Sequence, residues 1–538
     1  MACVVTAGEL LDGHTVLDVE CLDRVYLNAY VPILQSSGQV VAFMTRHLGM
    51  PIPSPALIEK ISTKFRRAVE SYAAANGIPW VKFGKDDRKI DVMQPYLGRQ
   101  AATGRSGVAA IGVCQEFQRV WAAYQRDTKT AAPQYTFAKA DRRVTCYYFY
   151  LWDEGFGPAF IKVCAYFPYP AKIWVNGHEW AKRQAARAGI GFTELSNGFA
   201  SCDDPAGLQE ICDRLQPGTI EVFAQRWLHR LPMPFGPADQ EHGYWWECSM
   251  RQVEVSRTVV FDAPRRVRWF FEALIGDNLD LGRPENVEII FGRKIRRDTP
   301  GTFRAAIDRP VIGPDAGGVV LNIFYKHSRI KQYLKEGRAM RIETVINCPR
   351  DLRCNARLPN LAELQDKARA INRRILEAER AGQATVLASP AFERIAHPSV
   401  TADGRRTPAL RFGDPRVIAL AGALAATLTA AAGITNKSLR ALMTGLLGIP
   451  YTPGQMTYDL RRLRLTGLIR RIERTNTYVL TPDGIKFAVF YTKLHNRLLR
   501  PLMAADQAQA PPELRNALRT LSQYVDDYIT RARLRKAA

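Results

Sequence analysis

The sequence has no C-x-x-C pair among its ten cysteines, and these cysteines are scattered over 538 residues. Most of them lie among apolar neighbours, so we expect buried, reduced thiols rather than a zinc site or a disulfide framework. No run of about 18 apolar residues is present, and the first ten residues lack the basic segment and apolar core of a secretion signal. These absences predict a cytoplasmic protein with no membrane partner.

Acidic residues are too few to balance the basic ones. The chain carries 75 Lys and Arg against 52 Asp and Glu, which gives a formal net charge of +23 and an isoelectric point near 9.7. Such an excess favours a polyanionic partner, and nucleic acid is the leading candidate, with DNA favoured over RNA. The hydrophobic content of 47% is enough for several packed cores, so a folded multidomain protein is expected.

The order of helix-like and strand-like segments predicts an α+β multidomain protein. We expect a helix-rich N-terminal region over 1–135 and a central α+β domain over 136–350, whose antiparallel sheet is covered on one face by helices. A helical connector follows over 351–432, then a compact module over 433–505 and a C-terminal helix over 506–538.

A glycine loop at 104–107 runs into an apolar segment. Its spacing matches neither G-x-x-x-x-G-K-[ST] nor G-x-G-x-x-G, so it predicts a tight turn before a buried strand, with a phosphate-binding loop as the alternative.

Polar-faced strands are the main feature of the central region, at 251–256, 286–291, 321–326 and 341–345. Alternation places Glu254 with its polar neighbours on one face of the first strand, and Arg341 with Glu343 on one face of the last. Such a face is either solvated and crossed by salt bridges or a working surface.

The segment 324–344 combines a tyrosine beside a lysine, a basic loop and a returning Arg-Ile-Glu strand. It is similar to plasmid and phage rolling-circle replication initiators, which attack DNA with a tyrosine beside a divalent metal. The resemblance implies Tyr325 or Tyr333 as nucleophile and Lys326 as charge stabiliser. It also implies Mg²⁺ or Mn²⁺ held by Glu343 with Glu254 and Glu288. The chain departs from the family because its eight histidines include no His-apolar-His pair.

The competing interpretation of this region is a nucleic-acid-binding surface without chemistry. Its contacts would be the basic residues of the same strands and loop, namely Arg329, Lys331, Lys335, Arg338 and Arg341.

The module over 433–505 resembles a winged helix-turn-helix, chiefly in the run 459–469 and in 478–484 after it. The resemblance implies that one helix enters the major groove and that a hairpin wing contacts the DNA backbone. The implied helix contacts are Gln455, Tyr458, Arg461, Arg462 and Arg464, and the implied wing contacts are Arg470, Arg471 and Arg474. A module used only for protein packing is the alternative.

Three functions therefore remain open from the sequence. The first is a DNA-binding replication or mobile-element factor whose central sheet grips or cleaves a strand. The second is an RNA-binding ribonucleoprotein component without catalysis, and the third is a small-molecule enzyme with its pocket in the central domain. Basic charge does not separate the first two.

Overall fold

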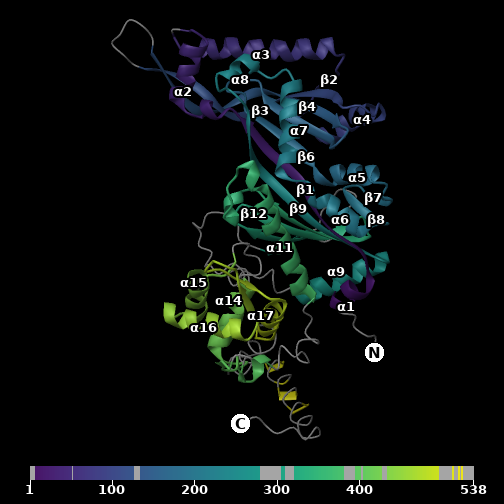
Figure 1. Ribbon diagram of the computed structural model, residues 1–538, viewed down its shortest axis with the longest axis vertical. Helices are drawn as coiled ribbons and strands as arrows, with labels where there is room; N and C mark the ends of the chain where they lie inside the picture. The colour runs from purple at the N-terminus through teal and green to yellow at the C-terminus, as the bar shows by residue number, and fades with distance from the viewer. Residues whose placement is uncertain are drawn as a thin grey trace. The chain divides into compact units, whose positions relative to one another are not determined.

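The computed structural model describes residues 7–50, 52–126, 134–278, 305–308, 320–380, 394–400, 404–426 and 433–495, with a few positions between 512 and 524. The chain divides into two compact units. The larger unit spans 13–272 and 300–372, and the smaller one spans 1–12, 273–299 and 373–538. Both helices and strands build the protein, which confirms the predicted α+β class (Figure 1).

Eleven of the described strands of the larger unit form one sheet, and two more form a separate hairpin. Neighbouring strands are antiparallel except for the parallel pair β2 and β3. From edge to edge the order is β10 (Ala305–Asp308), β11 (Val320–Tyr325), β12 (Ser328–Lys335), β13 (Ala339–Ile346), β9 (Glu247–Phe261), β1 (Thr15–Tyr30), β6 (Ala171–Asn176), β5 (Gly157–Cys164), β4 (Gln134–Asp153), β3 (Gly107–Arg126) and β2 (Trp80–Lys82).

The N-terminal region supplies two long strands of this sheet, so its prediction as helix-rich was incomplete. Strand β1 alternates buried Val25, Leu27 and Ala29 with partly exposed neighbours, which is the period of a strand with one covered face. The same region also forms α2 (Ser37–Ala42), α3 (Pro55–Ala75) and α4 (Lys89–Ala102). The predicted strand after the glycine loop is β3.

Helices cover both faces of the sheet. On one face, α5 (Gly177–Arg187) begins directly after β6, and it packs against β1 together with α6 (Pro205–Asp213) and the hairpin β7 (Phe192–Leu195) and β8 (Gly198–Cys202). On the opposite face, Asn372 of α11 (Leu361–Arg380) accepts a hydrogen bond from Thr344 and donates one to the carbonyl of Val255. Further helices are α1 (Ala7–His14), α7 (Pro217–Arg230), α8 (Pro237–Glu241) and α9 (Pro264–Asn278).

The smaller unit has its own apolar core, built around Leu420, Leu439, Leu463 and Phe487. Its elements are α14 (Pro415–Ala426), α15 (Asn436–Leu447), α16 (Pro453–Leu465), the hairpin β16 (Ile469–Arg471) and β17 (Tyr478–Leu480), and α17 (Pro482–Leu494), with a short hairpin β14 (Ser399–Val400) and β15 (Arg406–Thr407) before them.

Threonine caps start the helices of this module. The side chains of Thr435, Thr452 and Thr481 accept hydrogen bonds from the first turns of α15, α16 and α17. Gly448 ends α15 and Gly467 follows α16, both with positive φ, as expected for helix C-termini. Among the described residues, no helix is long and apolar enough to cross a membrane.

Candidate nucleic-acid interface and buried polar cluster

A β-bulge in β1 positions a carboxylate under the polar face of the sheet. Leu22 pairs with Val255 and Arg24 with Glu254, so two consecutive residues of β9 face three of β1, and Asp23 is the extra residue. Its side chain is thereby brought beside Glu254 of β9 and Glu343 of β13. Their carboxylates offer oxygens within 4.8 Å of one another, and all three residues are buried.

Three cations neutralise these three carboxylates, and together the six side chains form what we call the buried polar cluster. The Nη1 atom of Arg24 lies 3.3 Å from Oε2 of Glu254. The Nη1 atom of Arg341 lies 3.4 Å from Oδ2 of Asp23, and Nζ of Lys331 lies 3.3 Å from Oε2 of Glu343. A buried carboxylate of this kind is tolerated only when it is paired and hydrogen-bonded.

Hydrogen bonds saturate the same carboxylates further. Tyr333 donates its hydroxyl to Glu343 at 2.6 Å, and the Gln252 amide donates to Glu254 at 2.6 Å. The amide of Asn197, from the turn between β7 and β8, donates to Asp23 at 2.7 Å. The cluster therefore fixes the positions of β1, β9, β12, β13 and the β7–β8 hairpin relative to one another.

Burial sets the protonation of this region. Burial raises the pKa of Glu254, an effect that Arg24 opposes. Burial alone would lower the pKa of Arg341, but the charge of Asp23 raises it above its usual value. The pKa of Tyr333 is raised by burial and by Glu343, so this tyrosine keeps its proton and is a poor nucleophile.

Arg341 is fully buried because a glycine leaves room for it. A Cβ atom at Gly198, whose φ is +142°, would lie 2.3 Å from Nη2 of Arg341. This Nη2 atom has no hydrogen-bond partner among the described residues. Close by, the buried ring of His178 contacts the hydroxyl of Ser256 at 2.9 Å, and burial lowers the pKa of that histidine.

The predicted Mg²⁺ or Mn²⁺ does not fit this arrangement. The Nη1 atom of Arg341 lies 3.4 Å from Asp23 and 3.8 Å from Glu343, so a guanidinium already occupies the space between the carboxylates. The charges of the cluster balance without an ion, and its orphaned atom is a donor, which needs an acceptor rather than a cation. Glu288, the third predicted ligand, lies outside the described residues.

The predicted nucleophiles are separated by the sheet. Tyr325 pairs with Ser328, and alternation along β12 puts these two on the face opposite to Lys331 and Tyr333. Lys326 follows β11 with positive φ, and its ammonium lies 5.4 Å from the centre of the Tyr325 ring. Only Tyr333 of the three predicted catalytic residues therefore reaches Glu343.

Most of the predicted basic contacts of the central sheet are engaged within the protein. Lys331 and Arg341 belong to the buried polar cluster, and Lys335 contacts Glu336 at 3.2 Å and Ser196 at 2.8 Å. Arg329 is half-buried, and Arg338 in the β12–β13 turn is exposed. The polar face of this sheet is thus an interior surface rather than a broad nucleic-acid-binding one.

In the smaller unit, three of the predicted contacts have structural partners. Arg462 donates to the carbonyls of Pro408 and Ala409. Gln455 accepts a hydrogen bond from the backbone N–H of Thr452 at 2.8 Å, as part of a capping box. Arg471 donates to the carbonyl of Thr475 at 2.7 Å and to Asn476, which shapes the hairpin turn.

The other five predicted contacts are solvent-exposed. They lie on α16 and on the β16–β17 hairpin, and we call them the exposed basic surface: Tyr458, Arg461, Arg464, Arg470 and Arg474. Among the described residues, no carboxylate or carbonyl pairs with any of its four guanidinium groups. Tyr458 is 49% exposed, and the guanidinium of Arg416 lies 5.6 Å from its ring centre.

A second group of possible metal ligands lies after β11. His327, Cys348 and Asp351 offer ligand atoms within 4.8 Å of one another. Asp351 already accepts hydrogen bonds from the backbone of His327 at 3.1 Å and from the Ser328 hydroxyl at 2.8 Å. Its carboxylate thus ties the β11–β12 turn to the segment after β13.

The sequence patterns predicted neither Asp23 as a member of the cluster nor His178 as its neighbour, 3.8 Å from Asp23. The prediction of a helix-rich region over 1–135 places no strand at Asp23, although the alternation around Val25 and Leu27 is a strand signal. His178 lies two residues after Asn176, whose side chain caps α5, and no local pattern indicates that the His178 ring reaches Ser256 of β9.

No known protein family, curated protein or solved structure matches this chain.

Proposed function

We propose that this protein binds nucleic acid, with duplex DNA as the favoured ligand, through the exposed basic surface of its smaller unit. The observation that carries the proposal is the set of four arginines on α16 and the adjacent hairpin that have no partner among the described residues. Arginine offers a rigid fork of donors that suits both phosphate oxygens and guanine edges.

The order of elements supports this proposal. After α14, Ile434 forms a backbone bridge with Tyr478, with N–O distances of 2.7 Å in both directions. This bridge adds a third short segment to the β16–β17 hairpin, and α15 and α16 lie between the segments in sequence. The order helix, strand, helix, helix, hairpin is that of a winged helix-turn-helix, in which the helix before the hairpin enters the major groove.

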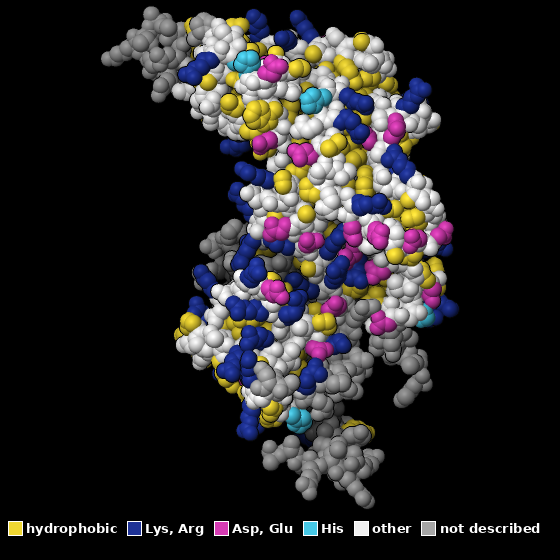
Figure 2. All heavy atoms as spheres, in the orientation of Figure 1, with side chains coloured by type: hydrophobic (Ala, Val, Ile, Leu, Met, Phe, Trp, Pro, Cys, Tyr) yellow, Lys and Arg dark blue, Asp and Glu magenta, His cyan; other side chains and the backbone are white. Residues whose placement is uncertain are grey.

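Local charge supports it as well. Between residues 433 and 495 the chain has ten Lys and Arg and three Asp and Glu. Asp459 is paired with Arg416 at 3.0 Å, and Asp483 with Arg394 at 2.8 Å. Figure 2 shows Lys and Arg side chains gathered over this unit, with few acidic ones among them. A field of one sign attracts a polyanion and steers its approach.

We propose no strand cleavage by the central sheet. Its carboxylates are buried and neutralised, and Tyr333 is hydrogen-bonded to one of them. The support for the binding function therefore comes from the smaller unit.

The test is the affinity for labelled duplex DNA of a variant with Arg461→Ala, Arg464→Ala and Arg474→Ala. We expect a loss of about 1 to 3 kcal/mol for each arginine that reads a base. The melting temperature should be unchanged, because none of the three arginines has a partner in the part of the chain that the structure describes. The matched control removes the same charge from exposed positions of α3, by Lys60→Ala, Lys64→Ala and Arg67→Ala.

Equal affinity of the two variants would contradict the proposal. The same titration with single-stranded and duplex RNA decides the nucleic acid, because a larger loss on RNA than on DNA would favour the ribonucleoprotein alternative.

A further inference from the structure

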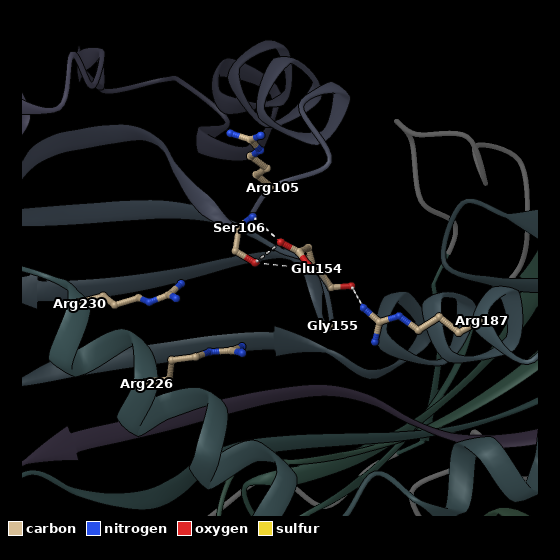
Figure 3. A pocket seen from close by; sticks show the side chains of 7 residues that line it. All are labelled: Arg105, Ser106, Glu154, Gly155, Arg187, Arg226 and Arg230. Atoms are coloured by element: carbon tan, nitrogen blue, oxygen red, sulfur yellow. Dashed lines mark hydrogen bonds between the residues drawn. The ribbon is translucent and has the colours of Figure 1, made fainter.

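The larger unit contains an open pocket of about 470 Å³ that is lined mainly by arginines. It forms where four segments meet: the loop before β3, the β4–β5 turn, the end of α5 and the last turns of α7 (Figure 3). The lining residues are Arg105, Ser106, Glu154, Gly155, Arg187, Arg226 and Arg230. Four of these seven are arginines and none has an apolar side chain, so the pocket is built to hold charge.

Two carboxylates, Asp153 and Glu154, lie beside the four guanidinium groups and leave an excess of positive charge. Asp153 precedes Glu154 in the chain and is fully buried; it pairs with Arg226 at 2.5 Å and accepts a hydrogen bond from Trp227 at 2.8 Å. Glu154 accepts hydrogen bonds from the backbone N–H of Ser106 at 3.1 Å and from its hydroxyl at 3.5 Å. Among the described residues, neither carboxylate forms an ion pair with Arg105, Arg187 or Arg230.

Two of those guanidinium groups have no acceptor in the described part of the chain. They belong to Arg105 and to Arg230, which lies over the Trp227 ring at 5.6 Å from its centre. Arg187 donates one hydrogen bond, to the carbonyl oxygen of Glu154 at 2.9 Å. Figure 3 shows these side chains around one hollow. Like charges gathered in this way repel one another unless an anion lies between them.

The walls of the pocket are held in place by their own hydrogen bonds. Ser106 and Glu154 bond reciprocally, since the Glu154 N–H also donates to the Ser106 hydroxyl at 3.0 Å. Asp153 accepts from the N–H groups of Gly155 and Phe156, which fixes the β4–β5 turn. The amide of Gln100 donates to the Arg105 carbonyl at 2.9 Å, which holds the loop before β3.

From this geometry we infer that the four-arginine pocket binds a phosphate group. A phosphate offers several acceptor oxygens in different directions and matches the guanidinium fork, so one group serves arginine donors from three segments. Its charge offsets the excess that Asp153 and Glu154 leave. No apolar side chain lines the pocket, so a ligand there is recognised through the guanidinium donors. The phosphate belongs either to a nucleic-acid backbone or to a small free phosphate, and the pocket chemistry is the same for both.

The test uses the full chain with Arg105→Ala and Arg230→Ala, because neither guanidinium has a hydrogen-bond acceptor or carboxylate partner among the described residues. The control is Lys64→Ala with Arg67→Ala, which removes two exposed charges from α3. In one arm, the rise in melting temperature with added inorganic pyrophosphate is measured. In the other, the affinity for duplex DNA is measured over a range of salt concentrations.

Two results support the inference and separate the sources of phosphate. If the pocket holds a backbone phosphate, the magnitude of the slope of log affinity against log salt decreases by about 1 to 2 in the pocket variant. The slope of the control is unchanged. If it holds a free phosphate, pyrophosphate raises the melting temperature of wild type and control but not of the pocket variant.

A pocket variant that matches the control in both arms overturns the inference. The exposed basic surface is tested by its own variant, so loss of DNA binding there and loss of phosphate binding here are read independently.

Discussion

Arg341 and Arg461 are the same residue type in opposite surroundings. Arg341 is fully buried, paired with Asp23, and touches a glycine that leaves room for it. Arg461 is exposed on α16 and has no partner among the described residues. The sequence predicted both Arg341 and Arg461 as nucleic-acid contacts. The difference teaches that a basic residue is available to a polyanion only when the fold has not already given it a carboxylate.

The same contrast holds for the two regions as wholes. In the buried polar cluster, three carboxylates and three cations balance within the protein, so the region stabilises the sheet and offers no charge to a ligand. On the exposed basic surface and in the four-arginine pocket, positive charge is left over. Excess charge on the surface costs some stability by self-repulsion, and binding a polyanion relieves that cost.

The largest effect is expected when the buried polar cluster is broken. Arg341→Met removes the partner of Asp23 and leaves buried negative charge uncompensated, so the free energy of unfolding should fall by about 3 to 5 kcal/mol. Denaturant unfolding measures this loss. Arg338→Met, on the exposed turn between the same strands, should change stability by no more than about 0.5 kcal/mol.

Two additions sharpen that comparison. Combining Arg341→Met with Asp23→Asn should recover part of the loss, because both charges of the pair are then gone.

Added Mg²⁺ or Mn²⁺ should leave the midpoint of wild-type denaturant unfolding unchanged. A metal-dependent gain that Glu254→Gln and Glu343→Gln abolish would instead restore the metal-site interpretation.

A smaller effect is expected at two lysines that face each other across β5 and β6. Lys162 is paired with Glu116, whereas Lys172 has no partner in the described residues, and burial together with Arg251 lowers the pKa of Lys172 from 10.5 to about 8. The unfolded chain then binds one more proton than the folded one between these values, so folding is favoured as pH rises from about 8 to 10.5.

Lys172→Met should therefore stabilise the protein at pH 7, and its advantage over wild type should shrink as pH rises above about 8. Lys162→Met should destabilise at pH 7, because it leaves Glu116 without its buried partner. Thermal unfolding at a series of pH values checks both variants. If the stability gain of Lys172→Met stays constant over this pH range, the pKa of Lys172 is not lowered in the folded protein.

The spacing of apolar and polar residues along the sequence predicts several of the strands that the structure contains. The strands predicted at 251–256, 321–326 and 341–345 lie at β9, β11 and β13, and the strand predicted after the glycine loop is β3. The exceptions have a physical cause. Strand β1 is buried on both faces over Val19–Asp23, so its polar residues did not mark a face, and the region was read as helical.

The candidate site was harder to predict. Alternation predicts that Glu254 lies on the polar face of its strand and Glu343 on the polar face of its own strand. The structure brings these two carboxylates together on the same face of the sheet. No sequence rule indicates that Arg341 would lie between them, because that depends on the bulge at Asp23 and the space left at Gly198. The four-arginine pocket draws on segments more than 100 residues apart, so only the fold reveals it.

The most direct test of the account is the salt dependence of duplex DNA binding by the wild-type chain. Each phosphate contact contributes a slope of about 0.9, so the four arginines of the exposed basic surface predict a fall in log affinity with log salt on the order of 4. Arg470→Ala with Arg474→Ala should lower that slope by about 2. An affinity that stays flat from roughly 50 to 300 mM salt would contradict the claim that unpaired arginines bind nucleic acid.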